Sequence, residues 1–114
     1  VATGKSRVGL NRALTATSLH QQFTASRTAD ETFGKPHPGM LLELMDELMV
    51  DPSEVVMVGD TSHDLNMASN AGVHGVGVTY GAHPHEELLA CAPQSVVHGV
   101  PELRSWLLAR IKQP

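Results

Sequence analysis

The sequence is poor in cysteine and aromatic residues, and it has no long apolar run. Cys91 is the only cysteine, so no disulfide can form within these 114 residues, and the reducing cytoplasm is the expected location. No apolar stretch approaches the ~18 residues that a membrane helix needs. Lysine and arginine number 8 against 12 aspartates and glutamates, and the basic residues form no patch. Neither nucleic acid nor an anionic membrane is therefore expected as the main partner.

What is present fits a small folded unit. Apolar residues make up 41% of the chain, which is enough for a packed core, and 114 residues suit one domain or part of one. The sequence begins at Val1 rather than at a methionine. We therefore expect it to be a piece of a longer protein.

The order of apolar and polar residues predicts helices and strands in alternation. Helices are expected over residues 6–18, 38–49, 62–71, 84–90 and from 101 onward, and strands over 23–25, 55–58, 74–79 and 95–97. The continuous apolar run at 55–58 is typical of a strand buried on both faces. Short connections between these elements predict an α/β fold with a mainly parallel sheet. Residues expected on the buried helix faces are Leu41, Leu42, Met45, Leu48, Met49, Leu103, Trp106, Leu107 and Ile111.

Polar residues follow the predicted strands, where the ligands of a parallel sheet bind. Thr3, Asp60 and the Thr79–Gly81 turn occupy such positions, and Asp64 lies near the first turn of the next helix. Two carboxylates together suit Mg²⁺, which usually takes one or two of them from the protein. Alternatively, Asp60 is a turn residue, and Ser62 or Asp64 caps the helix.

Two further segments could hold an anion. Lys35 lies beside Pro36 and close to Pro38, which fix the backbone just ahead of a helix, and a stiffly mounted ammonium suits a phosphate. The alternative for Lys35 is solvated surface charge. Thr3–Ser6 lies at a predicted strand-to-helix junction, where a hydroxyl and free backbone N–H groups form an anion site. Simple helix capping is the alternative there.

The remaining chemically active side chains predict no site. His37, His63, His83 and His85 lack a recognised zinc spacing, and there is no cysteine cluster, so we interpret them as surface residues. Cys91 has no activating neighbour in the sequence and is expected to be a small core residue. The methionines are also interpreted as core residues.

Taken together, these motifs resemble the haloacid dehalogenase (HAD) superfamily of hydrolases, specifically its phosphoglycolate-phosphatase-like branch. Thr3, which opens Thr-Gly-Lys-Ser, is similar to the family's second motif, and Lys35 in Gly-Lys-Pro-x-Pro is similar to the third. The apolar strand followed by Gly-Asp-x-x-x-Asp, with Asp60 and Asp64, is similar to the fourth. The resemblance implies a Rossmann-like, mainly parallel sheet flanked by helices.

The family's first motif, Asp-x-Asp-x-Thr/Val, and the cap domain of this branch do not occur in the sequence. Residues 1–114 therefore resemble the C-terminal part of a HAD core domain, carrying motifs two to four. The family's sheet order, 5-4-1-2-3, implies that the central nucleophile-bearing strand is missing between residues 55–58 and Val1–Thr3. We expect the 55–58 edge to lack a partner strand and to be open to self-association or to a separate segment.

The resemblance implies a magnesium-dependent phosphatase that forms an aspartyl-phosphate on the absent aspartate and acts on a small phosphorylated metabolite. Thr3 would donate a hydrogen bond to a phosphoryl oxygen, helped by the Gly4 N–H, and Lys35 would neutralise charge on the nucleophile and the phosphoryl group. Asp60 would bind Mg²⁺ directly, and Asp64 would act through water or by orienting Lys35. The substrate stays open, because in this family the cap largely sets specificity.

Two other classes of protein are considered. In a P-loop nucleotide-binding protein, Gly4-Lys5-Ser6 would end a Walker A motif and the strand before Asp60 would be a Walker B strand, but Lys35 and Asp64 would have no role. A non-catalytic fragment or interaction module is the other alternative. The missing nucleophile favours the latter for this polypeptide, whereas the retained motif residues indicate a catalytic parent.

Overall fold

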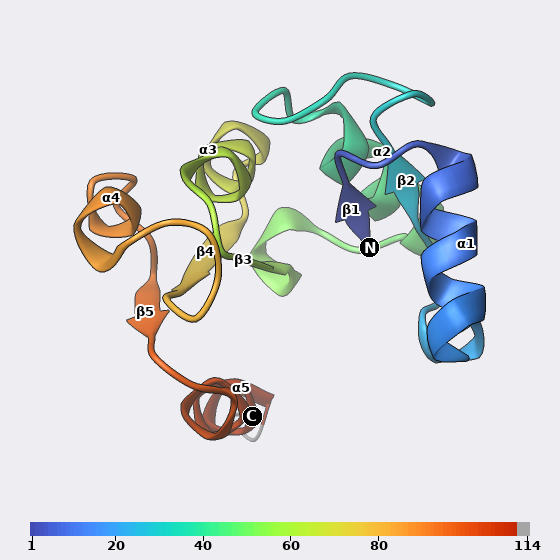
Figure 1. Ribbon diagram of the computed structural model, residues 1–114. Helices are drawn as coiled ribbons and strands as arrows, with labels where there is room; N and C mark the ends of the chain where they lie inside the picture. The colour runs from blue at the N-terminus through green and yellow to red at the C-terminus, as the bar shows by residue number, and fades with distance from the viewer. Residues whose placement is uncertain (112–114) are drawn as a thin grey trace.

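The computed structural model describes residues 1–111 of the chain. These residues form two small parallel sheets with helices around them (Figure 1). One sheet pairs β1 with β2, and the other has the order β3-β4-β5. The α/β fold with mainly parallel sheets is confirmed. The elements in chain order are β1 (Ala2–Thr3), α1 (Arg7–Thr17), η1 (His20–Gln22), β2 (Arg27–Thr28), α2 (Gly39–Leu48), η2 (Pro52–Glu54), β3 (Val56–Gly59), α3 (Ser62–Ala71), β4 (His74–Val78), α4 (His85–Leu89), β5 (Ser95–Val97) and α5 (Val100–Ile111).

Helices cover both faces of the β3–β5 sheet, with α3 on one side and α5 on the other (Figure 1). Met57 packs against the cluster of α2 and α3, whereas Val56 and Val58 pack against the cluster that α5 joins. Full burial of a valine or methionine side chain contributes about 1.5–3 kcal/mol, and these three half-buried residues gain part of it. The clusters consist of Met40, Leu41, Met45, Met67, Ala68, Ala71 and Val73 on the first side, and of Val76, Val78 and Val97 with Leu103 and Trp106 on the second.

No helix among residues 1–111 has the length and apolarity that a membrane crossing requires. The longest helix, α5, has 12 residues.

Gly72 ends α3 in a left-handed conformation, with φ 75°, as its position in the sequence predicts.

The second strand is shifted from its predicted place. A strand is expected at 23–25, but β2 is Arg27–Thr28. Phe23 is exposed, so the apolar residue that favoured a strand contributes nothing to the core. Thr28 instead is fully buried, and its hydroxyl donates to the Glu31 carboxylate at 2.9 Å.

Some residues predicted to face the core are exposed. On α2, Leu41 and Met45 of the predicted stripe are buried, and Met40 and Leu44 are buried beside them. The other predicted stripe residues, Leu42, Leu48 and Met49, are exposed. Met49 is 90% exposed, which contradicts its interpretation as a core methionine. Ile111, at the end of α5, is exposed as well, which contradicts its expected place on the buried face of that helix.

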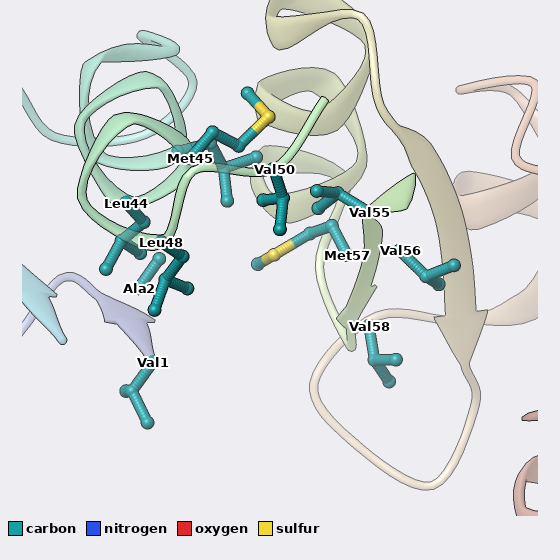
Figure 2. A pocket seen from close by; sticks show the side chains of 11 residues that line it. Val1, Ala2, Leu44, Met45, Leu48, Val50, Val55, Val56, Met57 and Val58 are labelled. Atoms are coloured by element: carbon teal, nitrogen blue, oxygen red, sulfur yellow. The ribbon is translucent and has the colours of Figure 1, made fainter. Parts of the chain in front are cut away.

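An apolar hollow of about 460 Å³ lies between the two sheets, and we call it the slot. Figure 2 shows β1 on one side, β3 on the other and side chains of α2 between them. Among the described residues, β3 pairs only with β4 and β1 only with β2, so both strands face the slot with an unpaired edge. The residues that line it are Val1, Ala2, Leu41, Leu44, Met45, Leu48, Val50, Val55, Val56, Met57 and Val58.

Candidate active site

Lys35 and Asp64 form an ion pair at the carboxyl ends of the strands. Lys35 follows β2 and Asp64 follows β3, so the carboxyl ends of both sheets open on the same side. Both side chains line a hollow of about 420 Å³, together with Asp60 and with Tyr80 and Gly81 from the turn after β4. The structure thus brings together three of the site residues that the sequence predicts.

Asp64 is held by the first turn of α3. Its Oδ2 accepts hydrogen bonds from the Thr61 backbone N–H at 3.2 Å and from the Thr61 hydroxyl at 2.9 Å, and Thr61 caps the Asp64 N–H in return. Oδ1 accepts from the Lys35 ammonium. Both carboxylate oxygens are therefore engaged, which suits a residue that orients Lys35.

The environment of Asp64 has opposing effects on its pKa. Burial raises the pKa of the carboxyl, but the Lys35 ammonium and the hydrogen bonds from Thr61 lower it by more. The pKa therefore lies below its ordinary value, and Asp64 carries the negative charge that fixes Lys35.

We expect Asp64→Asn to reduce the free energy of unfolding at pH 7 by about 1–3 kcal/mol, because it weakens a charge-assisted hydrogen bond. A lowered carboxyl pKa stabilises the fold above the unfolded-state pKa of about 3.9, and this contribution is lost as pH falls through the folded-state value. The difference in free energy of unfolding between wild type and variant should therefore become smaller below about pH 4. Urea unfolding at several pH values from 7 to 3 measures this difference, and a difference that stays constant would contradict this account.

Asp60 is held by the backbone of the turn after β4. The Ala82 N–H donates to Oδ2 of Asp60 at 3.0 Å, and the His83 N–H donates to the Asp60 carbonyl at 3.1 Å. Gly81 allows this close approach, because a Cβ there would overlap the Asp60 side chain. The other carboxylate oxygen, Oδ1, accepts no hydrogen bond from residues 1–111, which leaves it free for a ligand.

The same turn is also tied to α3. Nδ1 of His83 accepts a hydrogen bond from the Ser62 N–H at 3.0 Å, so this half-buried histidine caps the helix rather than lying free on the surface. Sequence reasoning missed that the Ala82 and His83 N–H groups hold Asp60, since backbone donors leave no signature in a sequence. The only signal was the position of the Thr79–Gly81 turn at a strand end.

Thr3 and Gly4 lie outside the lining of this hollow, to which the first sheet contributes Ala2. The Thr3 hydroxyl accepts from the Lys5 N–H at 3.2 Å. At the N-terminus of α1, the Asp30 carboxylate accepts from the Arg7 N–H at 3.1 Å, so the chain's own carboxylate occupies part of the predicted anion site. The phosphate-binding roles of Thr3 and Gly4 therefore stay predictions.

Ser6 caps α1 by accepting from the Gly9 N–H at 3.0 Å, which engages the hydroxyl that a P-loop would direct to a metal.

Cys91 is half-buried rather than buried, and its thiol lies 3.8 Å from the Ser62 carbonyl oxygen.

Comparison with known proteins identifies the family. A family model described as HAD-hydrolase-like matches residues 32–103, the segment that carries Lys35, Asp60 and Asp64. The chain belongs to the HAD-like hydrolases. It is 42% identical over 98 residues to the probable phosphatase IndB of Dickeya dadantii, an alignment that covers 85% of this chain and 43% of that protein.

A second relative of this HAD-like chain is the phosphoglycolate phosphatase of Vibrio vulnificus, 38% identical over 74 residues, covering 65% of this chain and 32% of that protein. Among solved structures, the putative phosphatase of Clostridium difficile superposes with a TM-score of 0.83 at 28% identity, covering 94% of this chain and 51% of that one. The chain thus spans less than half the length of these two curated relatives. The comparisons do not favour a P-loop protein.

Proposed function

We propose that these residues belong to a longer protein, here called the parent phosphatase, which hydrolyses phosphoric monoesters of small metabolites. The observation that carries this proposal is the Lys35–Asp64 ion pair beside Asp60, which places a fixed cation and an available carboxylate at one strand-end hollow. In such a site the lysine can bind the anionic oxygens of a phosphoryl group, and the carboxylate can bind a metal that accompanies it. The names of IndB and of the Vibrio enzyme, both phosphatases, support this reaction class.

The residues present fit Mg²⁺. Residues 1–111 contain no group of three or more histidine, cysteine, aspartate or glutamate side chains placed to hold a metal, but Mg²⁺ usually takes only one or two protein carboxylates. Asp60 would hold it, because Oδ1 is free and the Ala82 N–H fixes the carboxylate. Asp64 would act indirectly through Lys35, since both of its oxygens are engaged. A bound Mg²⁺ would neutralise phosphoryl charge.

The nucleophile of the proposed reaction is an aspartate outside residues 1–114. Its carboxylate oxygen would bond to phosphorus while the ester P–O bond breaks, and water would then cleave the aspartyl-phosphate to release phosphate. Lys35 would stabilise the negative charge that builds up on the phosphoryl oxygens, and Thr3 with the Gly4 N–H would donate to one of them.

We also propose that residues 1–114 are the C-terminal part of a HAD core domain, with the first motif and the cap outside this segment. The coverage of 43% of IndB supports that arrangement. The single cysteine leads us to propose a cytoplasmic location.

Assays of the 114-residue chain and of the parent phosphatase test the function. We expect the 114-residue chain alone to give no turnover of p-nitrophenyl phosphate above background, because it lacks the nucleophile. The parent should hydrolyse the ester, lose activity when EDTA removes Mg²⁺, and lose most of it in Asp60→Asn. An inactive parent across a panel of phosphate esters would contradict the phosphatase. Turnover by the chain alone, abolished in Asp60→Asn, would show that the nucleophile lies within these residues.

A further inference from the structure

Tyr80 places an aromatic side chain at the strand-end hollow. It lies in the turn after β4 and lines the hollow together with Lys35, Asp60 and Asp64. Among the described residues that line this hollow, it is the only aromatic one. Its side chain is nevertheless not packed away, since Tyr80 is 51% exposed. The ring thus lies beside the proposed phosphoryl site and keeps surface for a ligand.

The backbone is anchored on both sides of Tyr80. Before it, the Thr79 N–H donates to the Val97 carbonyl of β5 at 3.0 Å. After it, the Ala82 N–H donates to the Asp60 carboxylate at 3.0 Å. A tyrosine on a fixed backbone has only two side-chain torsions left to order, so a ligand that contacts it loses little affinity to ordering.

The ring of Tyr80 has no aromatic or cationic partner among residues 1–111. A cation over an aromatic ring occurs there at Trp106, under Arg110. The face of the Tyr80 ring can therefore stack on a bound molecule. The aromatic pairs formed by residues 1–111 are Phe33–His37, His63–His83 and His85–His98.

Charge decides which part of a phosphate ester Tyr80 can contact. The phosphoryl group carries the negative charge, and Lys35 supplies a cation for it at the same hollow. The face of a phenol ring carries partial negative charge, so it offers an anion no attraction. The organic group of the ester can instead stack on this face and cover its apolar surface. The volume of about 420 Å³ lies within the range of small-molecule sites.

We propose that Tyr80 is a specificity-determining residue of the parent phosphatase, whose ring contacts the organic group of the substrate and favours esters with a planar apolar group. The inference rests on the proposed function, because it needs an ester bound at the strand-end hollow. The ring does not touch the reacting phosphorus, so it contacts ground state and transition state alike. Its contribution should therefore appear in KM, whereas that of Lys35 should appear in kcat.

Two esters test the proposal in the parent phosphatase: p-nitrophenyl phosphate, which has an aromatic ring, and acetyl phosphate, which has none. Tyr80→Ala should raise KM for p-nitrophenyl phosphate about tenfold at nearly constant kcat, and should change both constants for acetyl phosphate less than about twofold. Tyr80→Phe keeps the ring and should behave as the wild type. Calorimetric titration gives the same comparison without turnover: Tyr80→Ala should bind phenylphosphonate about tenfold more weakly and methylphosphonate as before.

Phe23→Ala is the matched control. Phe23 is 46% exposed, close to the value of Tyr80, and it belongs to none of the aromatic pairs above, but it does not line the hollow. This variant should leave the constants for both esters unchanged.

Two results with Tyr80→Ala would overturn the proposal. One is an unchanged KM for p-nitrophenyl phosphate. The other is an equal loss with both esters, together with a lower melting temperature, because Tyr80 would then pack inside the parent rather than against the ester. A parent that hydrolyses neither ester would contradict the proposed function, and the phosphonate titrations would still decide whether Tyr80 contacts the organic group.

Discussion

Lys35→Ala in the parent phosphatase should lower kcat about 10²–10³-fold, because the variant removes the fixed cation from a phosphoryl group whose charge is spread over three oxygens. Asp64 holds the Lys35 ammonium beside Asp60, and both residues line the same hollow. The effect should fall on kcat more than on KM, since the charge grows in the transition state. Steady-state kinetics with p-nitrophenyl phosphate, together with circular dichroism to show that the variant folds, provide the measurement.

Arg27→Ala is the control for this prediction. Arg27 pairs with the Glu43 and Glu47 carboxylates at 3.2 and 2.8 Å, so it also is a cation engaged by carboxylates, but it lies away from the strand-end hollow. Surface ion pairs of this kind contribute about 0–1 kcal/mol to stability. The control should leave kcat close to the wild-type value. Small and equal effects of the two substitutions would mean that Lys35 is only surface charge.

The sequence predicted best the strands that are short apolar runs between turn residues. The strand predicted at 55–58 is β3 at Val56–Gly59, and β5 lies at Ser95–Val97 as expected, because apolar runs between turns leave few alternatives. The two-residue β2 could not be predicted in this way. Its buried residue is the polar Thr28, whose hydroxyl donates to the nearby Glu31 carboxylate, so no apolar run marks this strand in the sequence.

In the candidate site, the sequence indicated the charged residues but not the backbone contacts that hold them. Lys35, Asp60 and Asp64 have side chains of distinctive chemistry next to predicted elements, so their positions in the sequence indicated a common site. The contacts that hold Asp60 could not be predicted, because they come from the backbone of Ala82 and His83 and depend on how the turn after β4 folds back. For Asp64 the family resemblance implied two alternatives, action through water or orientation of Lys35, and the ion pair with Lys35 fits the second.

Gly59→Ala should reduce the free energy of unfolding of the 114-residue chain by about 1–3 kcal/mol. Gly59 is buried at the end of β3, where an added Cβ would overlap the Cβ, Cγ and Oδ2 atoms of Asp64. Asp64 cannot move away freely, since Thr61 and Lys35 hold its carboxylate and α3 fixes its backbone. The first turn of α3 must therefore shift, and the helix cap and the ion pair should weaken together. Urea unfolding measures the loss.

Gly4→Ala separates this steric effect from the general effect of replacing a glycine. A Cβ at Gly4 meets no atom within 4 Å, and Gly4 does not share the left-handed backbone of Gly72. Alanine also restricts the unfolded chain more than glycine does, which favours the folded state by about 0.4–1 kcal/mol at positions without strain. Gly4→Ala should thus leave stability unchanged or slightly raised while Gly59→Ala lowers it. If the two variants unfold at the same urea concentration, Asp64 does not constrain the end of β3 as the structure indicates.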